Sequence, residues 1–164
     1  MTIIVEDGTI VAGANSYLSL ADLKLGLPDY TSAELIALYD DAELSTMLIR
    51  AMEYLDSFHW KGLRVNPFHT VAWPRTDVLY APYTLYPEDQ VPVEVKKALT
   101  ALVAGVIEEG YGAIAPPQNI RREKVSQLEV EYYSNGGVGT ESELQQSARR
   151  LVSVFTTYLG AKRV

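Results

Sequence analysis

The sequence predicts a mainly α protein: a small helical bundle with a β-hairpin arm and a short N-terminal strand segment. Three observations predict it. Apolar residues three and four apart recur along the 164-residue chain, as on the buried stripe of a helix. Sequences typical of helix N-termini precede these stretches. Near residue 130, apolar and acidic residues alternate instead, as in a strand with one buried face.

The N-terminal stretch is expected to hold a short strand hairpin and two short helices. Residues 2–5 are rich in β-branched side chains and precede an Asp-Gly turn, with residues 9–11 as the returning strand. Ser19 and Thr31 each begin a capping box, in which a hydroxyl and an acid three residues later bind orphan backbone N–H groups. The first of these helices should end at Gly26.

A third helix is the element around which we expect the rest of the chain to pack. Asp40 begins its capping sequence, and its apolar stripe runs over residues 44–58. A fourth helix, residues 92–109, has proline in its first turn and a glycine after its end. We expect these two helices to pack together. The predicted structural core comprises Leu48, Leu55, Trp60, Trp73, Leu99 and Leu102.

The later part of the chain is expected to add an arm, a hinge and a terminal helix. The alternation around Leu128 and Val130 predicts a strand that pairs with residues 122–125, in a hairpin arm of about residues 121–134. Residues 135–140 form a glycine-rich hinge. Residues 141–164 form an amphipathic helix and tail. Thr140, just before this segment, begins its capping box. The first domain thus spans residues 1–134.

A loop rich in proline and tyrosine lies between Arg75 and Pro92. Long loops in a compact domain are usually functional or mobile. Its tyrosines, Tyr80, Tyr83 and Tyr86, have two interpretations: they fold back over the core, or they remain exposed and anchor a protein partner.

Charge is unevenly distributed. Residues 1–90 hold 13 acids and 5 bases, whereas residues 91–164 hold 8 acids and 9 bases, for a net charge of −7. Nucleic acids are bound by clustered Lys and Arg, which a chain this acidic largely lacks. A modest single-strand site remains open at the hairpin, where Tyr132 and Tyr133 lie near Arg121, Arg122 and Lys124 in the sequence.

Composition and motifs exclude several classes of protein. The absence of cysteine excludes disulfides, thiolate zinc sites and cysteine nucleophiles. The first residues form neither a signal peptide nor a membrane span, so we expect an intracellular protein. No serine-hydrolase, zinc-protease or phosphate-loop motif occurs, and the glycine cluster at residues 136–139 lacks the lysine of a phosphate loop.

A metal site is the one weak enzymatic signal. Glu53, Asp56 and His59 share a helix face, and His69 would have to return from the loop to join them. Metal sites need three or four ligands and supporting partners, so we interpret these residues as surface polar groups. We expect no enzyme, no catalytic residues, no metal and no cofactor.

Short motifs, each of low specificity alone, occur in a particular order from Thr2 to about Tyr133. They are Ile3–Thr9 with Val11–Tyr17, Leu48–Ala51, Tyr54–Asp56, Trp60–Gly62 with Arg64, Ala72–Arg75, Val91-Pro92 with Val95-Lys96, and Glu123–Val125 with Leu128–Tyr132. In this order they resemble the small head-tail connector, or adaptor, proteins of tailed bacteriophages. These head-completion proteins are often labelled DnaT-like single-stranded-DNA-binding proteins.

The resemblance implies a structural virion protein at the head-tail junction, found in the host cytoplasm during assembly. Such a protein forms a ring with itself, commonly a dodecamer, beneath the portal protein. The ring extends the channel for DNA ejection and joins the capsid to tail or neck proteins, which include head-closure and tail-terminator proteins. Duplex DNA passes through without sequence-specific binding, and no membrane is involved. The alternative is a DnaT-like single-stranded-DNA-binding replication accessory protein.

Two sets of contact residues follow from the connector hypothesis. Portal docking is assigned to the terminal helix because related connectors reach into the portal with their C-terminal segment. The subunit-interface residues are Lys124, Leu128, Val130, Tyr132, Tyr80, Tyr83 and Tyr86. The portal-docking residues are Leu144, Arg149, Arg150, Leu151, Phe155 and Leu159. The acidic loop at residues 77–89 and the long terminal helix depart from the pattern of the connector family. Beyond the residues named above, the resemblance therefore does not say which residues contact the portal or the tail.

Overall fold

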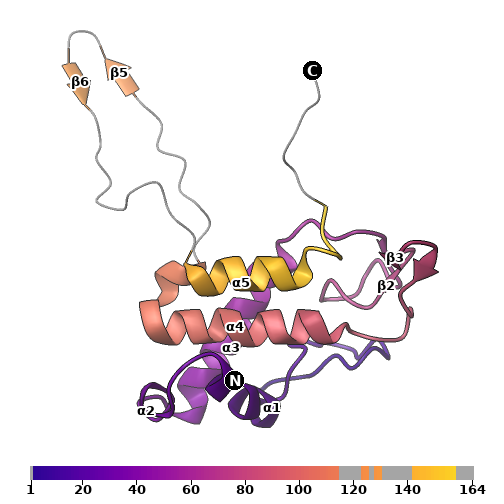
Figure 1. Ribbon diagram of the computed structural model, residues 1–164, viewed down its shortest axis with the longest axis horizontal. Coiled ribbons are helices and arrows are strands. Elements are labelled where there is room, and N and C mark those ends of the chain that lie inside the picture. Colours follow the sequence, from indigo (N-terminus) through magenta and orange to yellow (C-terminus); the bar gives the residue numbers. More distant parts are fainter. Residues whose placement is uncertain (1, 115–122, 126–127, 131–141, 158–164) are drawn as a thin grey trace.

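The computed structural model describes residues 2–114, 123–125, 128–130 and 142–157 (Figure 1). Its helices are α1 (Leu20–Gly26), α2 (Ala33–Ile36), α3 (Asp41–Asp56), α4 (Val93–Glu109) and α5 (Glu143–Val152), with 3-10 turns η1 (Leu27–Asp29) and η2 (Tyr111–Ile114). Its strands are β1 (Leu63–Arg64), β2 (Arg75–Thr76), β3 (Leu79–Ala81), β4 (Thr84–Leu85), β5 (Glu123–Val125) and β6 (Leu128–Val130).

The fold is a small mixed domain, so the predicted small helical bundle is wrong. Helix makes up 47% and strand 10% of the structure. The helices following the first two caps are short, at 7 residues for α1 and 4 for α2. Much of the chain between α3 and α4 forms turns and strand pairs, because its glycine and prolines interrupt the helical pattern.

The predicted N-terminal strand segment is also wrong. In the described part of this region the only ladder contact is one isolated bridge between Val5 and Ser16. The cause is Glu6, whose carboxylate accepts hydrogen bonds from the backbone N–H groups of Gly8 and Ile10, which a returning strand would need. Ile10 also has a positive φ of 63°, which regular strands do not contain.

Helix α4 is the centre of the domain. Every residue from Ala98 to Ile107 is buried, as expected of a helix that is apolar on all sides. Helices α3 and α5 both pack on it, and α5 lies alongside it in Figure 1. The predicted packing of the third helix on the fourth is therefore confirmed.

The predicted caps at Ser19 and Asp40 are confirmed, whereas α2 is capped by Ser32 rather than by Thr31. The Ser19 hydroxyl accepts from the N–H of Asp22 at 3.1 Å. The Asp40 carboxylate accepts from the N–H of Glu43 at 2.8 Å, and the Glu43 carboxylate accepts in return at 2.9 Å, which completes a capping box. Helix α5 is capped by Ser142 rather than by Thr140.

Two strand pairs lie between α3 and α4, where part of the chain was predicted to be a loop. Strand β1 pairs with β2, and β3 pairs with β4, both antiparallel. Gly62, just before β1, has a φ of 67°, and a Cβ there would lie 2.1 Å from the carbonyl oxygen of Thr76. Only glycine can occupy this corner without displacing the backbone.

The predicted hairpin is present as β5 and β6. They pair antiparallel, with Glu123 opposite Val130 and Val125 opposite Leu128. The rest of the predicted arm and the predicted hinge at residues 135–140 lie outside the described residues.

Five of the six predicted core residues are fully or almost fully buried, and Trp60 is partly buried against the same cluster. Trp73 contacts the rings of Trp60, Tyr86 and Phe155 edge to face. Within the described ranges, no helix has both the length and the apolar character required to cross a bilayer.

Candidate nucleic-acid interface

A groove of about 1010 Å³ lies between α3, η2 and the C-terminal part of α5. We call it the α3–α5 groove. Its main side chains are Arg50, Tyr54, Phe58, Tyr111, Arg149 and Arg150. It thus combines three aromatic rings with three guanidinium groups.

One side of the groove comes from α3 and the turn that follows it. Arg50, Tyr54 and Phe58 are spaced four residues apart, which places them along one face of the helix. Ala51 and Leu55, on the neighbouring face, are completely buried in the core. Burial of the apolar stripe therefore fixes the direction in which the groove residues project.

The other two sides come from distant parts of the chain. Gly110 ends α4 with a φ of 77°, which turns the backbone into η2 and brings Tyr111 to the groove. Ala148 and Val152 of α5 are completely buried, while Arg149 and Arg150 between them are exposed. The packing of α5 on the domain therefore presents both arginines to the groove.

Two of the arginines lie over aromatic rings of the groove. The Arg50 Cζ lies 4.4 Å from the centroid of the Tyr111 ring, and the Arg149 Cζ lies 5.0 Å from that of Phe58. These are cation–π contacts. Arg149 also donates from Nη2 to the Tyr54 hydroxyl at 3.3 Å.

The groove is a local basic region on an acidic chain. Glu53 is the only acid among the described residues that line it. Arg50 and Arg150 form no salt bridge with any acid in the described part of the chain. Arg150 also lines a second pocket, together with Glu108, Glu109 and Glu143, so Arg50 has the less acidic surroundings of the two.

These components match the requirements of single-strand binding. Unpaired bases stack on aromatic rings, while basic side chains follow the backbone phosphates. Arginine serves both purposes, because its planar guanidinium stacks and also donates to phosphate oxygens.

Comparison with known proteins gives one match. A family model described as "Putative DnaT-like ssDNA binding protein" matches residues 1–163. The chain belongs to this family. No curated protein and no solved structure matches it. The match of the DnaT-like family favours the single-strand-binding alternative, and none of these comparisons supports the resemblance to head-tail connectors.

In this DnaT-like protein, some tyrosines of the loop between Arg75 and Pro92 fold back over the core and others remain exposed. Tyr86 is half-buried and contacts the rings of Trp73 and Phe155. Tyr83, at the tip of the β3–β4 hairpin, is fully exposed at 102%, and Tyr80 is 48% exposed. Tyr86 therefore covers the core, while Tyr83 is accessible to a partner.

The residues assigned to portal docking are in different environments. Phe155 is completely buried in the domain's own core, and Leu144 and Leu151 are half-buried. Arg149 and Arg150 are exposed in the groove. Leu159 and Tyr132 lie outside the described residues, whereas Lys124, Leu128 and Val130 lie in the strands of the β5–β6 hairpin.

The four residues of the weak metal signal do not come together. The described residues contain no group of three that could hold a metal ion. Asp56 is not a surface group as predicted: its carboxylate accepts a hydrogen bond from the Tyr17 hydroxyl at 3.0 Å. Burial raises the pKa of Asp56.

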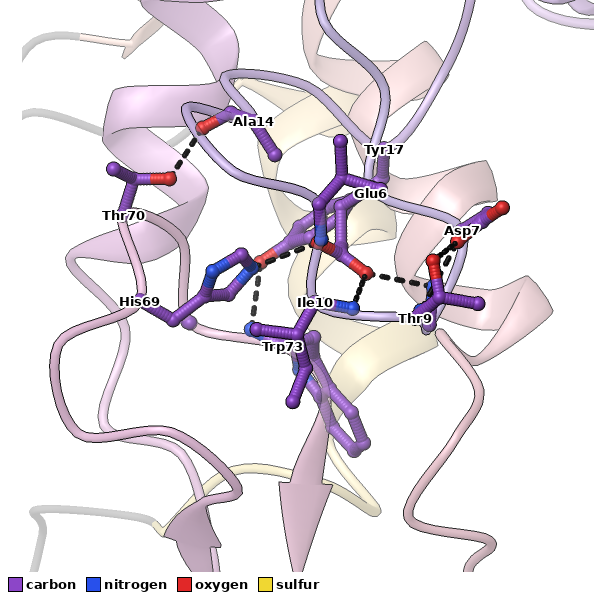
Figure 2. A network of polar contacts seen from close by, with 12 residues as sticks. Glu6, Asp7, Thr9, Ile10, Ala14, Tyr17, His69, Thr70 and Trp73 are labelled. Carbon is purple, nitrogen blue, oxygen red and sulfur yellow. Dashed lines mark hydrogen bonds and ion pairs between the residues drawn. The ribbon is translucent and has the colours of Figure 1, made fainter.

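His69 instead belongs to a buried polar network with Glu6 (Figure 2). The Nε2 of His69 lies 2.8 Å from one carboxylate oxygen of Glu6. Glu6 also accepts from the N–H groups of Gly8, Ile10 and Val11 at 2.7 to 3.0 Å. This network joins the N-terminal loop to the loop before Trp73 and has a structural role.

The groove was missed at the level of sequence. The one local signal is the spacing of an arginine and two aromatic residues along α3, which also suits an ordinary solvated helix face. Tyr111 and the α5 arginines are far away in the sequence, so only the packing of α5 and η2 shows that they meet Arg50 and Phe58.

Proposed function

We propose that the protein binds single-stranded DNA in the α3–α5 groove. The observation that carries this proposal is the pairing of guanidinium groups with the rings of Tyr111 and Phe58 in one groove. Both components of a single-strand site are then in contact before any ligand arrives. Membership of the DnaT-like family supports the same ligand.

Charge sets the expected strength of binding. The net charge of −7 repels a polyanion at long range, so association is slow at low salt compared with a basic protein. Each neutralised phosphate of a single strand adds about −0.7 to the slope of log K against log salt. The three arginines therefore predict a slope of about −2.

The test is fluorescence anisotropy with a labelled oligothymidine, measured over a salt series. We expect saturable binding that weakens as salt increases, and weaker binding to a duplex of the same length, because paired bases cannot reach the rings. Binding to duplex that equals binding to single strand, or no binding at low salt, would contradict the proposal.

A role as a protein connector is the second candidate. It is favoured by the exposed apolar side chains of the β3–β4 hairpin, where Leu79, Tyr83 and Leu85 are each more than half exposed. Exposed tyrosines with aliphatic neighbours are typical of protein interfaces. Mass measurement of the protein alone and with a portal protein tests it, and a monomer that never joins the portal ring would contradict it.

A further inference from the structure

The guanidinium groups of Arg50 and Arg149 lie over two aromatic rings of the groove. Each is planar and lies over an aromatic ring, at 4.4 Å from Tyr111 and 5.0 Å from Phe58. A planar guanidinium can stack on an aromatic ring, as a base can. In the absence of ligand, a guanidinium therefore lies over one face of each ring.

We propose that nucleobases displace these guanidinium groups, and that each released arginine turns to a phosphate of the same strand. This inference rests on the proposed function and concerns how the groove distinguishes bases from phosphates. In the free protein the two arginines lie over the aromatic rings, and in the complex with a strand they bind its phosphates. The groove then selects unpaired, base-bearing strands over other polyanions.

The exchange is physically favourable. A base gains more by stacking on a ring than an exposed guanidinium does by its cation–π contact. The released guanidinium is not left without a partner, because a phosphate accepts charge-assisted hydrogen bonds from it. Tyr111 is 40% exposed and lines the groove, so a base can reach the ring face under Arg50 once Arg50 moves.

Arg50 gives the cleaner test, because Arg149 also donates to the Tyr54 hydroxyl. Arg50→Gln removes a phosphate ligand but also uncovers Tyr111. Arg150→Gln is the matched control: Arg150 lines the same groove and, among the described residues, covers no ring. Both arginines are exposed, so both variants should fold, which thermal melts monitored by circular dichroism would verify.

The measurement is log K against log salt for oligothymidine binding by the wild type and both variants. Each variant should have a slope about 0.7 shallower than the wild type. Arg150→Gln should bind more weakly than the wild type and converge with it near about 1 M salt, where the counterion contribution vanishes. Arg50→Gln should cross the wild-type line below that salt and then bind more tightly, because no cover has to be displaced.

An abasic oligonucleotide of the same length separates the two roles of Arg50. Without bases nothing displaces the guanidinium from Tyr111, so Arg50→Gln should bind this strand no more tightly than the wild type at any salt concentration. If Arg50→Gln behaves like Arg150→Gln on oligothymidine, the exchange is wrong while the proposed function stands. If the wild type binds no single strand even at low salt, both are wrong.

Discussion

The Glu6 carboxylate lies 2.8 Å from Nε2 of His69, and the two side chains are 0% and 5% exposed. A polar group this deeply buried requires partners, and Glu6 accepts hydrogen bonds from three backbone N–H groups. The pair thus fixes the N-terminal loop against the segment that leads to Trp73.

Glu6→Ala should lower the free energy of unfolding by at least about 1–3 kcal/mol, the range for leaving a buried hydrogen-bonding group unsatisfied, because the N–H groups of Gly8, Ile10 and Val11 lose their acceptor. Urea denaturation measures this loss. Asp7→Ala is the control, because Asp7 is exposed and bonds only Thr9 among the described residues, so its loss should stay within about 0.5 kcal/mol. Equal losses for the two variants would contradict a central role for Glu6.

Tyr17 should make the fold sensitive to alkali. Burial, followed by the nearby Asp56 carboxylate, raises the pKa of Tyr17 well above 10.0. The folded state therefore keeps the phenol protonated, whereas the unfolded chain loses that proton near pH 10. This contribution to stability is complete below pH 10 and is lost as the pH rises above it.

Denaturation curves from pH 8 to 11, on a chain of eleven tyrosines, measure this dependence. Tyr17→Phe should be less stable at pH 8 by about 1–3 kcal/mol, because the N–H of Trp73 and the Asp56 carboxylate lose a buried partner. It should also lose less stability than the wild type as the pH rises. Parallel curves for the two proteins would assign the alkaline effect to other tyrosines.

Trp73→Ala should cost about 3–5 kcal/mol, the range for truncating a buried large aromatic residue. Trp73 is completely buried and contacts three other rings. Denaturant melts give the loss. A variant as stable as the wild type, yet unable to bind a partner, would show that this corner is an interface instead.

Tyr111→Ala should weaken binding to oligothymidine by about 1–3 kcal/mol, the range for one base–aromatic stack. The slope against salt should not change, since no cation is removed. Tyr83→Ala is the matched control: its ring is fully exposed but lies on the β3–β4 hairpin and not in the groove. An equal loss of affinity in both variants would place the strand elsewhere.

Local signals could be predicted from the sequence, and contacts between distant segments could not. The caps at Ser19 and Asp40 were found because the donor and acceptor lie within three residues of each other. The N-terminal strand segment was wrong because the pattern of residues 2–11 does not show that Glu6 takes the backbone donors of a returning strand.

The groove also combines a local signal that is visible in the sequence with distant contacts that are not. The exposed face of α3 was expected to be polar surface, and its spacing is indeed visible in the sequence. What makes it a candidate site is the arrival of Tyr111 and Arg149 from elsewhere, and this depends on the packing of α5 and η2 against α3. The site therefore arises from tertiary packing and not from a motif.

The chain of ring contacts has a practical consequence for spectroscopy. Phe58, which lines the groove, stacks on Trp60, and Trp60 contacts Trp73, which in turn contacts Tyr86 beside the hairpin. Trp73 is completely buried, whereas Trp60 is only partly so. Intrinsic fluorescence should therefore contain a shielded component from Trp73 and a quencher-accessible one from Trp60, which gives the groove an optical reporter without any added label.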